Sequence, residues 1–580
     1  MNRRDFLITS ATATTALALG ARAASPALPD SANDLLRDII RANDAQIPAL
    51  LARQERTPGH RWIGGLTNSH GLATVADTNG FVAALACAAC APGSRYYNDA
   101  ALAAPMLAAI AYMLSAQHAD GTVDYYATNF HSTPDLAFIL EGSCPAYQLL
   151  RGNTSPAFAP VAAELAKFIK RGGEALIVGG VHTPNHRWVV CAALAWVNSL
   201  FPDARYVARA DQWLAETIDL DPDGQYTEKS TTVYSPIVNQ ALINVARLLN
   251  RPALLEPVRR NLEMTLYYVH PDGEVVTEAS RRQDRHTRGS MARYYLSYRT
   301  LALHDGNGRF AAMARQIERN ARSQIGELAA FLTEPAFLTE PALLRDLPPD
   351  APLPTDYAKH FAYSNLARIR RGARSGTILA NNTTIFSFRH GAAALEAVRF
   401  ASAFFGKGQF NADLLEVRDG RYVLRQKLEG PYFQPLTAAQ IATGDHTKMA
   451  PNGTLANDSR AARARSEVQV QESVVTVTET GGKFSLEISV GGTDHVPVSI
   501  ELAFRAGGKL TGVEPISGAT DAFLLKSGTG RYTNGADVIE FGPGRVEHNY
   551  TQVRGALPKW DGLSVYLTGL TPFKTTLTIG

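Results

Sequence analysis

Residues 224–243 read GQYTEKSTTVYSPIVNQALI, a glycine followed by a polar stretch and then an apolar run with helical spacing. The same outline recurs roughly every 50 residues, a period that is typical of one helical hairpin per repeat. The other four passages begin at Gly71, Gly121, Gly173 and Gly273 with GLATVADTNGFVAALA, GTVDYYATNFHSTPDLAFIL, GEALIVGGVHTPNHRWVVCAALA and GEVVTEASRRQDRHTRGSMARYYL. Each glycine predicts a turn between helices.

Repeated hairpins can bury their apolar faces only against their neighbours. The polar residues just before each second helix should therefore gather at one end of the array. They would form a ring of amide, imidazole, phenol and guanidinium groups, and such a ring is a candidate active site. Its members are Asn79, Asn129, His131, Asn185, His186, Tyr234, Arg285, His286 and Arg288.

Helical periodicity extends from about residue 33 to about residue 332 and predicts about eleven helices. Ser132-Thr133-Pro134-Asp135 indicates a helix start, with a capping residue followed by a first-turn proline. Hairpins that alternate inner and outer helices close into an (α/α) toroid, complete or incomplete, of about five to six hairpins. An open superhelix is the structural alternative.

The second half of the chain has the period of β-strands. Polar residues alternate with two apolar series, which are Phe484, Leu486, Ile488, Val490 and Val498, Ile500, Leu502, Phe504. This pattern predicts an antiparallel β-sandwich, so the fold class is α+β with several domains. The predicted boundaries are a signal at 1–23, a toroidal catalytic domain at 24–345, a proline-dense linker at 346–370 and the sandwich at 371–580.

The N-terminus has the features of an export signal. Arg3-Arg4-Asp5-Phe6-Leu7 is a twin-arginine pattern, and Ala21-Arg22-Ala23 resembles a cleavage site. We therefore expect a periplasmic or secreted protein. The apolar core between them is too short to cross a bilayer, and no membrane insertion is expected elsewhere.

Composition narrows the range of partners. Apolar residues make up 45% of the chain and the net charge is only +3, as in a globular protein without a strongly basic surface. Nucleic acid is therefore not an expected partner, although a local basic cleft is compatible with this charge.

Asn185, His186 and Arg187 form the densest polar passage. We expect Asn185 to cap a helix that begins at His186. Because helix N-termini attract anions, these three side chains could then clamp a carboxylate. A capping amide beside a hydrogen-bonded histidine is the alternative. One repeat later stands Tyr234, whose phenol is a weak base unless cations such as Arg288 stabilise its phenolate. A tyrosine that only packs at a helix start is the alternative there.

The chain resembles the polysaccharide lyases of the heparinase II/III-like and oligoalginate-lyase type. In that family an Asn or His motif begins one inner helix and a catalytic Tyr begins the next, which Asn185-His186 and Tyr234 match. The run DGQYTEKSTTVY at 223–234 is similar to the family's D-G-S-Y-x-E-x-S-x-x-Y pattern. The resemblance covers most of the chain and implies a toroid followed by a sandwich. His390 and Tyr432 are candidates for the family's catalytic residue in the β domain.

The resemblance implies β-elimination at a uronic acid of an acidic polysaccharide or oligosaccharide. Asn185 and His186 would neutralise the carboxylate and so stabilise the enolate-like intermediate. A base then removes the C5 proton and an acid protonates the departing O4. Tyr234 is predicted for one or both proton roles, with His131 as its partner. This scheme requires no cofactor.

Further residues are predicted to bind the substrate or an ion. The expected substrate-binding residues are Arg187, Asn129, Arg285, Arg288, His182, Glu228 and Tyr432. The arginines belong to a basic cluster of Arg281, Arg282, Arg285, Arg288 and Arg293, for which a solvated face is the alternative reading. No catalytic metal is expected, although His390, His446 or His495 could hold a structural divalent ion.

Two other functions compete with a lyase. A glycoside hydrolase on a similar toroid would use carboxylates such as Asp124, Glu228 and Glu278. A non-catalytic glycan-binding protein would need stacking aromatics but not the Asn-His-Tyr set. The ring is richer in Asn, His, Tyr and Arg than in paired acids, which favours elimination.

Overall fold

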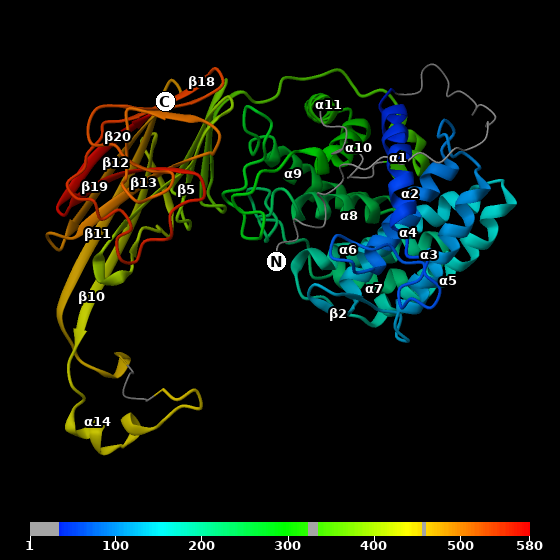
Figure 1. Cartoon of the computed structure of the whole chain (residues 1–580), viewed down its shortest axis with the longest axis horizontal. Coiled ribbons are helices and arrows are strands. Elements are labelled where there is room, and N and C mark those ends of the chain that lie inside the picture. The colour runs from blue at the N-terminus through cyan, green and yellow to red at the C-terminus, as the bar shows by residue number, and fades with distance from the viewer. Residues whose placement is uncertain (1–33, 323–333, 455–459) are drawn as a thin grey trace. The chain divides into compact units, whose positions relative to one another are not determined.

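The chain divides into two compact units. The computed structural model describes residues 34–322, 334–454 and 460–580. Unit 1 extends to Pro354, except that His270–Asp272 clusters with unit 2, which otherwise comprises Thr355–Gly580 (Figure 1). The predicted signal at 1–23 lies outside the described residues. Within them, no helix combines the length and apolar character needed to cross a membrane.

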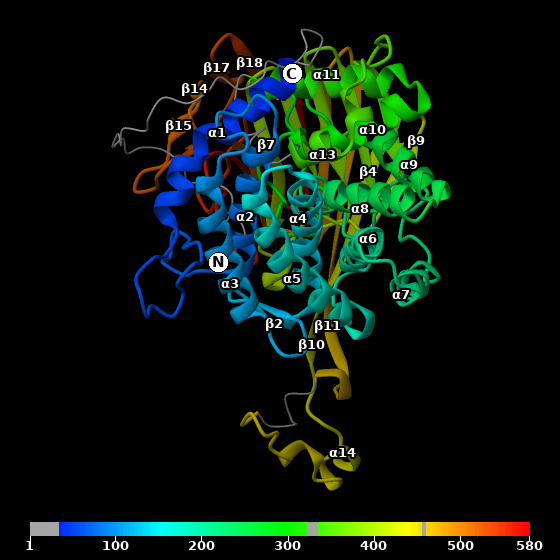
Figure 2. The ribbon, with the colours of Figure 1, turned by 90° about the vertical axis from the view of Figure 1, so that its right-hand side faces the viewer.

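Unit 1 is built from alternating inner and outer helices. The inner helices α2, α4, α6 and α8 pack side by side in chain order (Figure 2), while α3 packs against α2 and α5 packs against α4. This arrangement confirms the predicted (α/α) toroid. The helices are α1 (Asp34–Arg53), α2 (Val75–Cys90), α3 (Ala103–Ala116), α4 (Thr133–Gly152), α5 (Ala159–Val178), α6 (Pro184–Leu200), α7 (Ala204–Leu214), α8 (Tyr234–Leu248), α9 (Leu255–Thr265), α10 (Tyr295–Asp305), α11 (Gly308–Arg322) and α13 (Glu334–Thr339).

Four of the five repeat glycines lie in the predicted turns. The backbone N–H of Gly71, Gly121 and Gly224 donates to the carbonyl three residues earlier, at 3.0, 2.9 and 3.0 Å. These glycines and Gly273 all have positive φ, between 71° and 95°. Glycine adopts this conformation without strain, which explains why the residue recurs at the same point of the repeat.

Gly173 does not mark a turn, and this prediction was wrong. It lies inside α5 and is buried. A Cβ at this position would lie 2.8 Å from Tyr206 Oη and 3.0 Å from Val197 Cγ1. The glycine therefore permits close packing between α5 and the following hairpin, and α5 continues to Val178 before the chain turns.

The starts of the inner helices decide where the polar side chains point. Ser132 caps α4 as predicted, because its side chain accepts a hydrogen bond from Asp135 N. In contrast, α6 begins at Pro184 with Thr183 as its capping residue, so Asn185 lies within the first turn and is not the N-cap. Proline at the first helical position is pre-organised for a helix start, which moves the start ahead of Asn185.

Unit 2 is a sandwich of two sheets. The first sheet has the order β15-β16-β19-β13-β7-β6-β5-β4-β3, with β8 paired to β7, and the second has the order β14-β17-β18-β20-β12-β11-β10-β9. Neighbouring strands are antiparallel except for β16 and β19, which are parallel. The strands are β3 (Asp356–Phe361), β4 (Leu366–Arg371), β5 (Arg374–Leu379), β6 (Phe386–His390), β7 (Ala393–Ser402), β8 (Gly408–Gln409), β9 (Leu415–Arg418), β10 (Arg421–Phe433), β11 (Arg465–Thr480), β12 (Lys483–Gly492), β13 (Pro497–Phe504), β14 (Lys509–Thr511), β15 (Glu514–Pro515), β16 (Ala522–Leu524), β17 (Gly530–Asn534), β18 (Asp537–Gly542), β19 (Leu563–Leu570) and β20 (Phe573–Ile579).

The core of unit 2 lies between its sheets. Phe386 and Phe388 of β6 contact Phe484 of β12, with ring centroids 5.0 and 5.6 Å apart. The predicted alternation is confirmed for β12. It fails for β13, where Ser499 and Glu501 are buried as well as the apolar residues, because the loop that contains Trp560 covers the outer face of this strand.

The predicted linker at 346–370 is too long. Strands β3 and β4 fall within it, and unit 2 begins at Thr355. Most of β3 is exposed or half-exposed, as its sequence DYAKHF suggests. An edge strand with charged residues lacks the apolar alternation by which the other strands were recognised. The connector is therefore restricted to the proline-dense residues 346–354.

Strands β10 and β11 continue beyond the rest of their sheet. β9 pairs with β10 only at 421–424, and β12 pairs with β11 only from residue 471 onward. The remaining residues pair only with each other, as far as Phe433 opposite Arg465. They form a two-stranded ribbon that leads to the short helix α14 (Ala438–Ala442) (Figure 1).

Candidate active site

Tyr234 is fixed by the loop that precedes it. It is the first residue of α8, and its backbone N–H donates to Ser230 Oγ at 3.1 Å. Thr231 Oγ1 donates to Val276 O at 2.6 Å, which ties this loop to the next repeat. The side chain of Tyr234 is only 2% exposed.

The loop at 276–290 is held against the same helix start by Asp284. This buried carboxylate accepts hydrogen bonds from Thr232 N at 3.1 Å and from Thr232 Oγ1 at 2.8 Å, and also from Ser280 Oγ. Arg282 and Gln283 immediately precede Asp284 in the chain. The same anchor therefore positions both of their side chains beside Tyr234.

Tyr234 lies between a guanidinium group and an amide. Arg282 Cζ is 5.0 Å from the centroid of the phenol ring, and Gln283 Nε2 donates to Tyr234 Oη at 2.8 Å. Burial opposes the charge of Arg282, but its hydrogen bond with Tyr234 and the attraction of Glu228 outweigh burial and raise its pKa. Burial lowers the pKa of Arg293, and the attraction of Asp284 and Tyr234 offsets part of this effect. Positive charge is thus concentrated around the phenol.

Asn185 is oriented by Glu228. Asn185 Nδ2 donates to Glu228 Oε1 at 2.6 Å and to Thr183 Oγ1 at 3.1 Å, and the backbone N–H of Asn185 donates to the same carboxylate at 3.1 Å. An ionised carboxylate only accepts hydrogen bonds, so this contact sets which end of the amide faces Glu228. Asn185 Oδ1 is buried and has no hydrogen-bond partner in the described part of the chain.

Glu228 joins the two parts of the site. Its second oxygen lies 3.4 Å from Arg282 Nε, and Arg282 covers the ring of Tyr234. Asn185 and Tyr234 are therefore linked by a chain of contacts through Glu228 and Arg282, although they lie at the starts of different inner helices. We call this group the Asn185–Tyr234 cluster, and its members are Asn185, His186, Glu228, Tyr234, Arg282 and Gln283.

His186 belongs to the cluster by its position next to Asn185. It is 2% exposed, and its ring meets His182 edge-on with centroids 4.8 Å apart. Phe138 of α4 also meets it edge-on, with centroids 6.1 Å apart. His182 is exposed, so the histidine pair leads from the surface to the buried amide.

His131 does not contact this cluster, and its polar atoms are engaged elsewhere. Its Nδ1 lies 2.9 Å from Asp120 Oδ2, its backbone N–H donates to Asp124, and its ring stacks on His118 with centroids 3.7 Å apart. Hydrogen bonds from Thr122, followed by that from His131, hold the pKa of Asp120 well below its usual range. All these partners belong to residues 118–131, within the same repeat as His131.

Two predicted substrate-binding residues are held by protein carboxylates. Arg187 pairs with Glu216 at 2.9 Å and with Asp219 at 3.2 Å. Asn129 Nδ2 donates to Asp135 Oδ2 at 2.6 Å. Both side chains therefore have their charged or amide groups engaged by carboxylates outside the Asn185–Tyr234 cluster.

The other predicted residues divide between the two units. Arg285 and Arg288 are exposed on the loop that carries Arg282 and Gln283. Tyr432 lies on β10 of unit 2. Sequence reasoning noted Arg282 only as one member of the basic cluster, and it missed Gln283. Both stand in an irregular loop, where neither helical nor strand periodicity indicates which way a side chain points.

The carboxylates of the alternative hydrolase are already engaged. Asp124 binds His118 Nε2 at 2.8 Å as well as the backbone of His131. Glu278 is buried and accepts from Thr277 N. Within residues 34–322, 334–454 and 460–580, no group of three or more His, Cys, Asp or Glu side chains is arranged to hold a metal ion.

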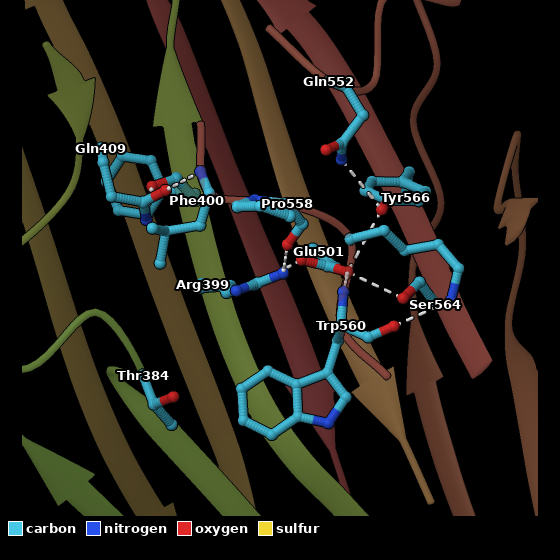
Figure 3. Close-up of polar contacts among 12 residues, drawn as sticks. Thr384, Arg399, Phe400, Gln409, Glu501, Gln552, Pro558, Trp560, Ser564 and Tyr566 are labelled. Atoms are coloured by element: carbon cyan, nitrogen blue, oxygen red, sulfur yellow. Dashed lines mark hydrogen bonds and ion pairs between the residues drawn. The ribbon is translucent and has the colours of Figure 1, made fainter. Parts of the chain in front are cut away.

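A second polar group lies in unit 2 on the outer face of β7, β13 and β19 (Figure 3). Glu501 accepts hydrogen bonds from Trp560 N at 2.9 Å, Ser564 Oγ at 2.7 Å and Tyr566 Oη at 3.1 Å, and it pairs with Arg399 at 2.5 Å. We call this group the Glu501 network. Both oxygens of its carboxylate are in use, as expected of a contact that holds a loop onto a sheet.

Comparison with solved structures identifies the fold. Heparinase III is 11% identical, with a TM-score of 0.54 over 93% of this chain and 82% of that one. The chondroitin AC lyase of Streptomyces coelicolor A3, solved in complex with chondroitin sulphate, is 15% identical, with a TM-score of 0.53 over 97% and 80%. A Paenibacillus xanthan lyase is 10% identical, with a TM-score of 0.58 over 94% of this chain and 57% of that one. The chain thus has the polysaccharide lyase fold.

No family model matches the sequence, and a search of curated proteins finds no match either.

Proposed function

We propose that this protein is a polysaccharide lyase that cleaves a uronic-acid-containing glycan by β-elimination. The observation that carries the proposal is the Asn185–Tyr234 cluster, in which a buried amide and a phenol from successive repeats are linked through Glu228 and Arg282. The fold, which three polysaccharide lyases also have, supports it.

The amide side of the cluster suits the carboxyl group of a uronic acid. The C5 proton becomes acidic only when the charge on this carboxyl is neutralised. Asn185 uses both N–H groups on Glu228 and Thr183 and keeps Oδ1 as an acceptor. A carboxyl group that carries a proton donates to such an oxygen, and His186 beside it is the proton donor. In this orientation Asn185 stabilises the neutral form of the substrate acid.

The phenol side of the cluster suits proton transfer. A nearby cation favours the phenolate form of a tyrosine, and Arg282 lies over the ring of Tyr234. Tyr234 then removes the C5 proton and returns a proton to the departing O4, while Gln283 holds its oxygen in place. Each step uses side chains of this chain and no cofactor.

The remaining parts of the proposal follow from the surface and the N-terminus. The exposed cations Arg285 and Arg288 and the exposed His182 would contact neighbouring acidic sugars. The twin-arginine pattern in the sequence supports export of the enzyme to the periplasm or out of the cell.

The test is a product assay on a panel of uronates. The mature protein is incubated separately with alginate, chondroitin sulfate, heparan sulfate, xanthan and a glucuronan. Elimination creates a C4–C5 double bond that absorbs in the ultraviolet, and we expect this absorbance with at least one polymer. New reducing ends without the absorbance would instead identify a hydrolase. The absence of both signals would contradict enzymatic cleavage of these substrates.

A further inference from the structure

Unit 2 displays two exposed aromatic rings beside its two-stranded ribbon. Phe405 is 43% exposed and Tyr432 is 59% exposed. The rings contact each other, with centroids 5.6 Å apart and planes inclined by 63°. Exposed apolar side chains that touch each other are a better sign of a binding surface than single exposed ones.

The backbone of Phe405 is in a conformation that phenylalanine rarely adopts. Lys407 N donates to Phe404 O at 3.0 Å, which closes a four-residue turn. The two central residues, Phe405 and Gly406, have φ of 49° and 69°. Such turns favour Asn-Gly, and a bulky residue at positive φ is strained. Strain that is retained for an exposed ring points to a role for that ring.

The ring of Phe405 is held rigidly. A Cβ on Gly430 of β10 would lie 2.3 Å from Phe405 Cδ2, so the ring rests directly on the backbone of this strand. Phe404 meets it edge-on, with centroids 5.0 Å apart. A ring that is already immobilised loses little freedom when a ligand stacks on it, which favours binding.

Cations flank the aromatic pair. Lys407 is exposed, and the exposed Arg554 lies against Gly406, since a Cβ on this glycine would be 3.4 Å from Arg554 Nε. Neither side chain forms an ion pair with any described residue. Arg465 is also close but donates to Glu429, and its hydrogen bond, with help from Lys427 and Lys407, lowers the pKa of Glu429.

We propose that Phe405, Tyr432, Lys407 and Arg554 form a second glycan-binding surface, which holds an acidic polysaccharide. The C–H faces of sugar rings pack on the exposed aromatic rings, while the cations pair with carboxylate or sulfate groups. Charge complementarity distinguishes this occupant from a neutral glycan or an apolar protein surface. The choice of ligand rests on the proposed function, but the surface is made only of residues in unit 2.

The test is retardation of the full mature chain in native gels that contain one polymer. The polymers are the five uronates of the product assay, and hydroxyethylcellulose is the neutral control. We expect Phe405→Ala and Tyr432→Ala each to weaken retardation about tenfold, from the loss of one stacking contact. In the double variant Lys407→Gln/Arg554→Gln, the retardation should lose most of its dependence on salt concentration. Leu414→Ala, at another exposed apolar residue (57%), should behave as wild type.

Three outcomes would contradict the proposed glycan-binding surface. They are equal retardation of the wild-type chain by hydroxyethylcellulose, no retardation by any uronate, and wild-type retardation of the Phe405→Ala and Tyr432→Ala variants in every gel. Thermal melting of each variant checks that it is folded.

A kinetic readout separates this proposal from the proposed function. If both hold, Phe405→Ala raises KM on the polymer and leaves turnover of a short oligomer unchanged. Polymer binding that depends on Phe405, without any elimination product, would support the surface and contradict the lyase. Elimination with no effect of Phe405→Ala on polymer binding or KM would support the lyase and contradict the second surface.

Discussion

The Glu501 network of unit 2 and the Asn185–Tyr234 cluster of unit 1 contain the same residue types but differ in how completely their polar atoms are hydrogen-bonded. Both contain a buried glutamate, an arginine and a tyrosine. Glu501 fills its oxygens with Trp560, Ser564, Tyr566 and Arg399 (Figure 3). The cluster instead leaves Asn185 Oδ1 buried without a partner in the described chain. Buried polar atoms are usually paired, so this acceptor is free to take the hydrogen bond from a substrate that the proposed function requires.

The two tyrosines show the same contrast. Burial, followed by the charge of Glu501, raises the pKa of Tyr566, which keeps this phenol as a neutral donor. Tyr234 accepts a hydrogen bond from Gln283 and lies under the guanidinium of Arg282. The phenol of Tyr566 is thus tied to a carboxylate that holds a loop, whereas the phenol of Tyr234 lies beside a guanidinium group and an amide.

The largest expected effect is that of Tyr234→Phe. Loss of the phenolic oxygen removes the proton carrier and should lower kcat about 10²- to 10⁴-fold, while substrate binding is retained. Steady-state rates from ultraviolet absorbance and equilibrium binding measure the two parts. Tyr566→Phe is the matched control and should leave kcat unchanged. Full activity of Tyr234→Phe would exclude Tyr234 from the chemistry.

Glu501→Gln should damage stability and not turnover. Arg399 and Glu501 have side chains only 8% and 7% exposed, and removing one partner of such a pair costs about 3–5 kcal/mol. Urea unfolding followed by a probe in unit 2 measures this loss. The double change Arg399→Met with Glu501→Leu should restore part of it. If Glu501→Gln abolished elimination in fully folded protein, the network would have to be catalytic.

Glu228→Ala should lower kcat about 100-fold, because Asn185 loses the contact that orients its amide. Glu228→Gln keeps an acceptor for this amide and should retain more activity. A positioning role predicts this order, whereas a general acid in a hydrolase would be lost equally in both variants. The comparison of the two variants on the same substrate decides between them.

Glu141 should make the stability of unit 1 depend on pH. Burial raises the pKa of this α4 carboxyl to about 7, and the hydrogen bond from Asn244 offsets only part of the rise. The folded protein thus keeps a proton that the unfolded chain releases near pH 4.5. Stability should fall by about 2 kcal/mol as pH rises from about 4.5 to 7. Glu141→Gln should flatten the curve of unfolding free energy against pH, and an unchanged curve would contradict the shift.

The smallest effect is expected for Arg187→Gln. Because Arg187 is already paired with Glu216 and Asp219, its loss should cost about 1 kcal/mol of stability and leave kcat and KM near wild type. If the variant lost as much rate as an Asn185 variant, Arg187 would have to be one of the residues that bind the substrate.

The repeat in the sequence was enough to predict the toroid and to place Asn185 and Tyr234 near the starts of two inner helices. Period and turn chemistry are local properties. They were misleading where a glycine served packing, as at Gly173, where Pro184 began a helix ahead of Asn185, and where strands lacked a simple alternation, as in β3 and β13. Choice of partner is not local. That Arg187 pairs with Asp219, and His131 with Asp120, depends on how separate segments approach each other.

Gln283 is a residue that the sequence analysis missed because its contact partner could not be predicted. Nothing in the loop at 276–290 indicates that this amide reaches Tyr234, because its position depends on the contact between Asp284 and Thr232. The predicted arginines of this loop were found by charge alone, and charge does not indicate that Arg282 covers the phenol.

The most direct test of the account is a double-mutant cycle on elimination, with Asn185→Ala, Tyr234→Phe and the combined variant, each checked for folding by thermal melting. Residues that serve one chemical step have effects that are far from additive. The account predicts that the combined variant is about as slow as the slower single variant. Rate losses that multiply would mean that Asn185 and Tyr234 act independently, which would contradict a single site shared by the two helix starts.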